Sequence, residues 1–217
     1  MKRLLLVLLL CLLPLCAGAE GLTTHIVGCT LEGEYIHQLI ADNGQTLYFT
    51  AMEPVPHVTL DDVNFDGVPD IAVLISAGAS NAFYSFFVND GGTYVFVPVP
   101  GQSWGVANYR LYPEQKLLLS QASNGYAGAL HEWRLYRWEG NTLKTVRSAV
   151  AEEYAESAFS DRQYTVTTHF DRIHITVRDY AAEDGEGTVI YEKTVQLDEV
   201  SAALLDEESE MLWQGLN

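Results

Sequence analysis

Hydrophobic and polar residues alternate with a period of two along most of the chain, which is the pattern of half-buried β-strands. Short clusters of Asn, Asp and Gly separate several of these runs. Asp42-Asn43-Gly44 is the clearest cluster, because Asn-Gly accepts the positive φ that a tight hairpin turn requires. The pattern predicts three hairpins, which pair residues 36–40 with 47–49, 83–88 with 94–97, and 133–138 with 143–146.

Other segments predict further strands and two helices. Residues 71–75 form a nearly continuous apolar run, which is typical of a strand buried on both faces. Shorter strands are expected at 117–119, 164–168, 173–177 and 188–195. Helices are expected at 149–159 and 200–213. The second places Val200, Leu204, Met211 and Leu212 near one face, so we expect it to cap the sheet.

A weak internal repeat supports an all-β fold. Residues 86–94 resemble residues 135–143 at an offset of 49 residues, which is near the length of a propeller blade, about 40–50 residues. Two copies are too few to establish a propeller. The sequence therefore predicts a single all-β, antiparallel domain, propeller-like or barrel-like, with a short C-terminal helix.

The N-terminus has the features of a secretory signal peptide. Lys2 and Arg3 precede an apolar run at residues 4–15, and Ala17-Gly18-Ala19 is a small-x-small cleavage site. We expect residues 1–19 to be removed and residues 20–217 to form one β domain in the periplasm or outside the cell. No later apolar run is long enough to insert into a membrane. Cys29 alone survives in the mature chain, and we expect it to be a buried small hydrophobe.

The charge balance excludes several classes of partner. Asp and Glu number 29 against 12 Lys and Arg, which gives a net charge of −17. A nucleic-acid-binding protein needs a basic surface, and anionic membrane surfaces attract basic segments. We therefore expect neither partner.

The segment from Asp62 to Asp70 carries the pattern of a calcium-binding loop. Oxygen side chains stand at its positions 1, 3, 5 and 9, and Gly67 at position 6 allows the sharp turn that such loops need. An all-oxygen donor set suits Ca²⁺ better than transition metals. Position 12 is Val73 in place of the usual Glu, so we expect a strand-flanked loop. The predicted ligands are Asp62, Asn64, Asp66, Asp70 and the carbonyl of Val68. The alternative is an acidic turn that binds no metal.

This loop, followed by an apolar strand, resembles the calcium loop of FG-GAP and integrin-type propeller repeats. Residues 36–146 also resemble a group of exported bacterial proteins that includes immunity proteins of antibacterial type IV secretion systems and that is similar to periplasmic lysozyme inhibitors. The shared features are the calcium loop, an aromatic hairpin at residues 84–96, and the segment Tyr-Arg-Trp-Glu-Gly-Asn-Thr-Leu at residues 136–143.

The resemblance implies inhibition of a cell-wall (peptidoglycan) hydrolase by a loop that enters its carboxylate-lined cleft. The candidate loop contains Asn124, Gly125 and Tyr126. Tyr126 would be its tip, because a rigid aromatic with a hydroxyl suits a cleft that ends in polar groups. The alternative is an ordinary wide turn with a half-buried tyrosine.

Catalytic motifs are lacking from the sequence. The six histidines show no zinc-ligand spacing, and neither a nucleophile elbow nor a phosphate-binding glycine loop occurs. We expect a non-enzymatic binding protein that uses Ca²⁺ structurally. Two alternatives remain open: an envelope structural or adhesive module that binds glycan or protein, and a hydrolase with dispersed carboxylates.

Overall fold

The computed structural model describes residues 21–102, 104–124, 130–154, 172–180, 187–196, 212–213 and 216. Its strands divide between two compact units. Unit 1 comprises residues 1–108 with 138–143, and unit 2 comprises residues 109–137 with 144–217. The predicted signal peptide at 1–19 lies outside the described residues, and the expectation of a single domain over 20–217 stays a prediction.

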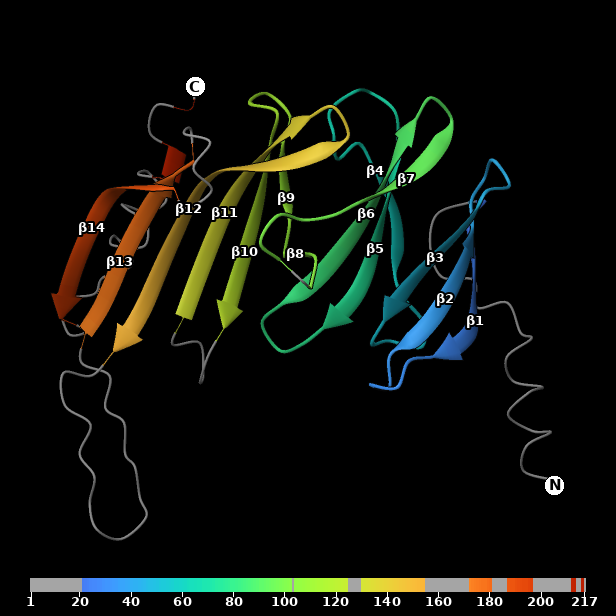
Figure 1. The fold of residues 1–217 in the computed structure, drawn as a ribbon, viewed down its shortest axis with the longest axis horizontal. Coiled ribbons are helices and arrows are strands. Elements are labelled where there is room, and N and C mark those ends of the chain that lie inside the picture. The colour runs from blue at the N-terminus through green and yellow to red at the C-terminus, as the bar shows by residue number, and fades with distance from the viewer. Residues whose placement is uncertain are drawn as a thin grey trace, which may run out of the picture. The chain divides into compact units, whose positions relative to one another are not determined.

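Two antiparallel sheets build unit 1 (Figure 1). The first has the order β1-β2-β3, and the second has the order β4-β5-β6-β7 with β8 paired to β6. Their bounds are β1 Thr23–Cys29, β2 Tyr35–Ile40, β3 Thr46–Ala51, β4 Val58–Asp61, β5 Asp70–Ala77, β6 Ala82–Asp90, β7 Thr93–Val97 and β8 Val106–Ala107.

One hydrophobic core lies between the two sheets of unit 1. Leu39 and Phe49 of the first sheet share it with Ile71 and Phe87 of the second. Two hydrogen bonds also join the sheets. The Gln45 side chain accepts a hydrogen bond from the Tyr94 amide at 2.7 Å and donates one to the Tyr94 carbonyl at 2.8 Å. These contacts hold the start of β3 against β7 and so position the second sheet against the first. The candidate metal loop projects from this second sheet.

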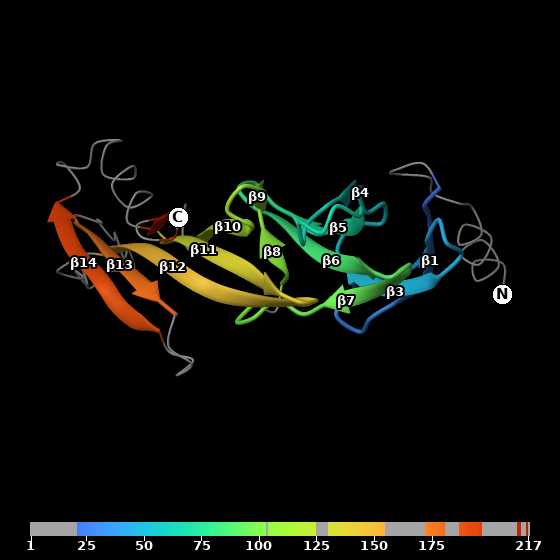
Figure 2. The same cartoon turned by 90° about the horizontal axis from the view of Figure 1, so that it is seen from above.

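A six-stranded antiparallel sheet of order β14-β13-β12-β11-β10-β9 forms unit 2. Figures 1 and 2 show these strands side by side in that order. Leu119, Leu135 and Val177 form a core with Leu212. The bounds of the six strands are β9 Arg110–Tyr112, β10 Leu117–Asn124, β11 Leu130–Glu139, β12 Thr142–Tyr154, β13 Arg172–Asp179 and β14 Thr188–Gln196.

The predicted all-β, antiparallel class is confirmed, and so are the three predicted hairpins. The part of the chain that the structure describes forms three open sheets and no closed barrel. The two copies of the weak repeat form the β6–β7 and β11–β12 hairpins, which belong to different sheets. Gly91 and Gly140 occupy equivalent turn positions, with φ of 59° and 58°.

Residues 149–154 belong to β12, so the prediction of a helix over 149–159 is wrong for this part. Ala and Glu favour helix intrinsically. However, β12 pairs with β13 through Tyr154, and Ala149 and Ala151 alternate into the sheet's core. Tertiary pairing therefore overrides local propensity.

Leu212, Trp213 and Leu216 pack on the six-stranded sheet, and the predicted helix over 200–213 stays a prediction. Leu212 and Trp213 are helical, while residues 200–211 of the expected helix lie outside the described residues. Leu212 is 2% exposed, and the ring centroids of Trp213 and Tyr112 are 4.5 Å apart. The burial of Leu212 and the ring contact of Trp213 hold these residues against the six-stranded sheet.

Cys29 is exposed, so the prediction that it is buried is wrong. It is the last residue of β1, which lies at the edge of its sheet. A register irregularity between Ile26 and Gly28 shifts the strand before this residue. The burial was inferred from the general tendency of free cysteines to be buried, and that tendency does not hold at the exposed end of this edge strand.

His37 is a buried titratable group in the core of unit 1, at 1% exposure. Its ring stacks on Phe49 with centroids 5.1 Å apart, and its Nε2 lies 3.0 Å from the Glu53 carbonyl. Burial lowers the pKa of His37 below its ordinary value of 6.5, and the bond to Glu53 opposes that shift. As the pH falls, the unfolded chain takes up this proton before the folded chain.

We therefore expect the stability contribution of neutral His37 to be complete above pH 6.5 and to be lost as the pH falls through its lower folded pKa. His37→Gln should show a smaller loss of urea midpoint between about pH 7 and pH 5 than the wild type. His57→Gln is the matched control, because His57 is exposed. Equal pH slopes for the wild type and His37→Gln would contradict the assignment.

Candidate metal centre

The predicted calcium loop connects β4 to β5 at one end of the second sheet of unit 1. Asp61 and Asp70 are paired across the two strands, so residues 62–69 must reverse the chain within one short loop. Gly67 has φ of 87° and Phe65 has φ of 63°. Glycine adopts this conformation freely, whereas it is uncommon for a bulky residue. The loop is therefore held by specific interactions.

Those interactions come from the acidic side chains of the loop itself. The two carboxylate oxygens of Asp62 accept the amides of Asp66 and Gly67, each at 3.0 Å. Asp66 Oδ1 accepts the amide of Val68 at 2.8 Å. Asn64 Oδ1 accepts the Asp66 amide at 3.1 Å, and Asn64 Nδ2 donates to Asp66 Oδ2 at 2.9 Å. Each side chain at positions 1, 3 and 5 thus closes the loop around its own backbone.

This arrangement fits a hard cation through three side chains. A carboxylate has about four lone-pair sites, and the contacts above use two on Asp62 and two on Asp66. Asn64 Oδ1 also keeps acceptor capacity. Within the described residues no three His, Cys, Asp or Glu side chains gather closely enough to hold a metal. The residues that would hold a calcium ion here are Asp62, Asn64 and Asp66, with the Val68 carbonyl, and the ion would neutralise the two carboxylates.

Asp70, the predicted ligand at position 9, has a different environment. It is 0% exposed. Its Oδ2 accepts the amides of Val63 and Asn64 at 3.0 and 3.4 Å, and its Oδ1 accepts the amide of Asn89 on β6 at 2.8 Å. Burial raises the pKa of the Asp70 carboxyl, and these three amides oppose that shift. Asp70 thus joins the start of the loop, at Val63 and Asn64, to Asn89 of β6.

Sequence spacing could not reveal the part played by Asn89, which lies 19 residues beyond Asp70. The contact follows from the pairing of β5 with β6, which places Ile71 opposite Phe87. The role of Asp70 as a ligand of Ca²⁺ stays a prediction.

The predicted partner-binding loop is largely outside the described part of the chain. Gly125 and Tyr126 lie outside it, and Asn124 is the last residue of β10. The strands on either side, β10 and β11, pair from Leu117 with Arg137 to Asn124 with Leu130. The prediction that a turn connects two antiparallel strands here is consistent with that register.

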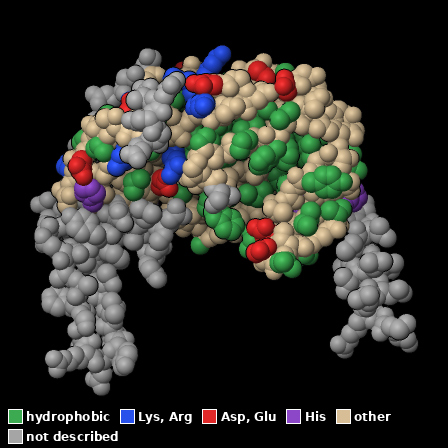
Figure 3. Space-filling view, in the orientation of Figure 1, with side chains coloured by type: hydrophobic (Ala, Val, Ile, Leu, Met, Phe, Trp, Pro, Cys, Tyr) green, Lys and Arg blue, Asp and Glu red, His purple; other side chains and the backbone are tan. Residues whose placement is uncertain are grey.

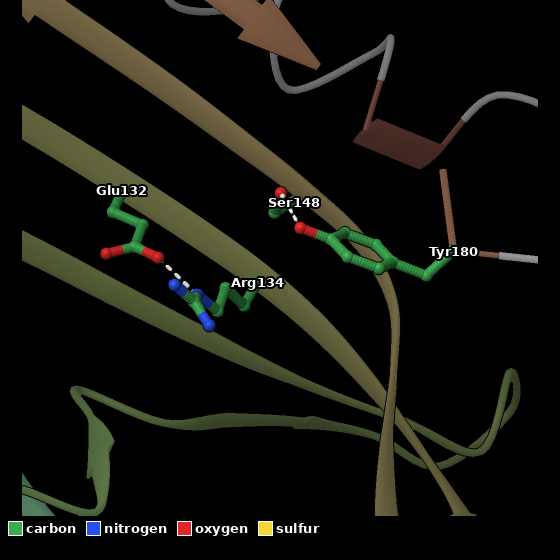
Figure 4. A network of polar contacts seen from close by, with 4 residues as sticks. All are labelled: Glu132, Arg134, Ser148 and Tyr180. Carbon is green, nitrogen blue, oxygen red and sulfur yellow. Dashed lines mark hydrogen bonds and ion pairs between the residues drawn. The ribbon is translucent and has the colours of Figure 1, made fainter. Parts of the chain in front are cut away.

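A second polar cluster lies on the six-stranded sheet of unit 2 (Figure 4). Glu132 and Arg134 of β11 form an ion pair. Ser148 Oγ of β12 lies 3.3 Å from the hydroxyl of Tyr180. Burial also raises the pKa of the neighbouring Tyr136 to about 12, so this phenol stays protonated at neutral pH. Glu132 pairs with Arg134 and Ser148 with Tyr180, whereas the buried Tyr136 hydroxyl has no hydrogen-bond partner among the described residues. We assign the cluster to the structure of the sheet.

Comparison with known proteins adds a distant likeness in fold. No family model matches the chain, and no curated protein matches it. A solved structure titled "Structure of a Xanthomonas Type IV Secretion System related protein" is similar to it, with 14% sequence identity and a TM-score of 0.45. The match covers 81% of this chain and 84% of that chain.

A search for membrane-spanning helices in the described residues finds none with the required length and hydrophobicity.

Proposed function

We propose that this chain is an exported, non-enzymatic binding protein that carries a structural Ca²⁺ in the loop from Asp62 to Asp70 and inhibits a peptidoglycan hydrolase. The observation that carries the proposal is the closed acidic loop between β4 and β5. Its carboxylates are already positioned by backbone amides, so a bound cation adds stability without a large rearrangement. The ion serves the fold, because a lone Ca²⁺ enclosed by protein offers no open position for chemistry.

The partner class is supported by charge and by the resemblance described above. A net charge of −17 attracts a cationic partner and accelerates its association, and this effect weakens as salt is added. A cationic surface attracts a protein to an anionic polymer such as a cell wall for the same electrostatic reason. An acidic inhibitor is complementary to such an enzyme.

Affinity capture followed by reconstitution tests the proposal. The purified protein is used as bait in an envelope extract of its source organism, with calcium and with chelator, and any hydrolase recovered is purified and assayed on a peptidoglycan suspension. We expect a one-to-one complex that slows turbidity loss. Recovery of wall polymer without a protein partner, or an unchanged hydrolase rate in the complex, would contradict inhibition and favour the adhesive alternative.

Tyr126→Ala is expected to weaken this inhibition by about thirtyfold or more, which corresponds to the loss of about 2 kcal/mol or more that defines an interface hot spot. The matched control is Tyr48→Ala, which removes a tyrosine that is 60% exposed on β3. The measurement is the inhibition constant in the turbidity assay. Equal constants for the two variants would remove Tyr126 from the interface.

A further inference from the structure

A hollow in unit 1, away from the calcium loop, has the lining of a small ligand site. Its volume is about 280 Å³, close to the lower end of ligand pockets, which is about 300 Å³. Figure 3 shows hydrophobic side chains gathered over the part of the molecule that contains β3 to β7. The hollow is lined by Glu34, Thr50, Met52, Ile75, Ser76 and Trp104.

Trp104 is presented at this hollow by a rigid piece of backbone. Its side chain is 53% exposed, although large aromatics usually bury most of their surface. The next residue, Gly105, has φ of 81°, and a Cβ there would lie 2.3 Å from the Tyr84 carbonyl oxygen. Only glycine allows this approach. Val106 then pairs with Tyr84 as β8 joins β6. The backbone that carries the exposed indole is therefore fixed on its C-terminal side.

Three polar residues line the same hollow from other segments. Glu34 precedes β2 and has its backbone fixed by Thr30, whose hydroxyl accepts the Glu34 amide at 3.1 Å. Thr50 belongs to β3 and Ser76 to β5. The structure records no hydrogen bond from these three side chains to another described residue. They are thus available to a ligand as one carboxylate acceptor and two hydroxyls that both donate and accept.

We propose that this hollow binds one ring of a neutral or N-acetylated saccharide. A pyranose has a face of C–H groups that packs on an aromatic ring, and its edge carries hydroxyls that need both donors and acceptors. Trp104 supplies the aromatic face, and Glu34, Thr50 and Ser76 supply the polar contacts. The single charged lining residue is a carboxylate, which repels phosphate, sulfate and carboxylate ligands.

A cationic side chain is the other ligand class to consider, because Trp104 and Glu34 could form a cation–π and ion-pair site. Ammonium and guanidinium groups only donate hydrogen bonds, so they leave the donor capacity of Thr50 and Ser76 unused. The charged group also fills little of the 280 Å³. The saccharide uses the full lining, so the observations favour it.

Titration of the purified protein with an N-acetylglucosamine trimer tests the proposal by calorimetry, with nuclear magnetic resonance shifts of the tryptophan indole as the second readout. We expect binding in the range of about 10⁻⁴–10⁻³ M, as suits a small open site. Trp104→Ala should weaken it at least tenfold, and Trp104→Phe should restore part of the loss. Phe96→Ala is the matched control, because Phe96 is equally exposed at 54% but does not line the hollow.

Glu34→Gln separates the two ligand classes. It keeps an acceptor oxygen, so saccharide binding should fall only a few-fold, whereas binding of a cation should be lost. Absence of trimer binding up to about 10 mM, equal binding by Trp104→Ala and Phe96→Ala, or binding of arginine ethyl ester in place of the trimer would overturn the proposal. The site goes beyond the proposed inhibition, since its variants leave Tyr126 and the loop from Asp62 to Asp70 intact.

Discussion

Asp70→Ala is expected to destabilise unit 1 by about 3 kcal/mol, the largest effect of a single substitution in the loop. Removing the carboxylate leaves the amides of Val63, Asn64 and Asn89 without their acceptor. Each buried amide that loses its partner costs about 1–3 kcal/mol. Part of this cost is offset, because burial also disfavours the Asp70 charge, as its raised pKa shows.

Urea denaturation at neutral pH in the presence of chelator measures this effect without any contribution from a bound ion. Asp70→Asn should fall between the wild type and Asp70→Ala, because its amide oxygen still accepts on one side. Asp90→Ala is the control, since Asp90 is an exposed carboxylate at the end of β6. Equal urea midpoints for Asp70→Ala and Asp90→Ala would show that the three amides form hydrogen bonds with water when the carboxylate is removed.

The strands were predictable because each hairpin is encoded locally. Asp42-Asn43-Gly44 turns the chain between β2 and β3, and Gly44 adopts the expected positive φ of 81°. The failures arise where distant pairing decides the outcome. Residues 149–154 have helical propensity but gain hydrogen bonds and burial from β13. Cys29 was expected to be buried from its residue type alone, but it ends an edge strand, and residue type does not indicate where a strand lies in its sheet.

The candidate metal loop was predictable in composition and only partly in geometry. The spacing of Asp62, Asn64 and Asp66 indicates side chains that can turn toward one centre, and the structure closes the loop around them. The burial of Asp70 depends on Asn89 of a neighbouring strand, so no local pattern could indicate it.

The hollow at Trp104 was not predictable from sequence for a related reason. Its lining comes from four separate segments, which only the packing of the two sheets brings together. The one local sign was Trp104-Gly105, a large aromatic followed by a residue free to adopt positive φ. That pair alone does not distinguish a ligand platform from a core residue.

Calcium is expected to raise the melting temperature of the wild-type protein by about 5–10 °C. With a dissociation constant of about 10⁻⁴ M, as in extracellular modules, about 10 mM Ca²⁺ is a hundredfold excess and stabilises by about 2.7 kcal/mol. Each kcal/mol shifts the melting temperature by about 2–4 °C for a chain of this size. The physical source is neutralisation of the Asp62 and Asp66 carboxylates, which both accept backbone amides of the same loop.

Asp66→Ala removes one carboxylate from this set together with the acceptor of the Val68 amide. Its melting temperature in calcium should therefore fall to the value of the chelated wild type or below it, and chelator should not lower it further. Asp90→Ala should keep the full calcium response, because Asp90 lies outside the loop. Differential scanning calorimetry with Ca²⁺, with Mg²⁺ and with chelator makes the comparison. Superimposed wild-type curves in calcium and chelator would show that the acidic loop is closed by its own amides and needs no ion.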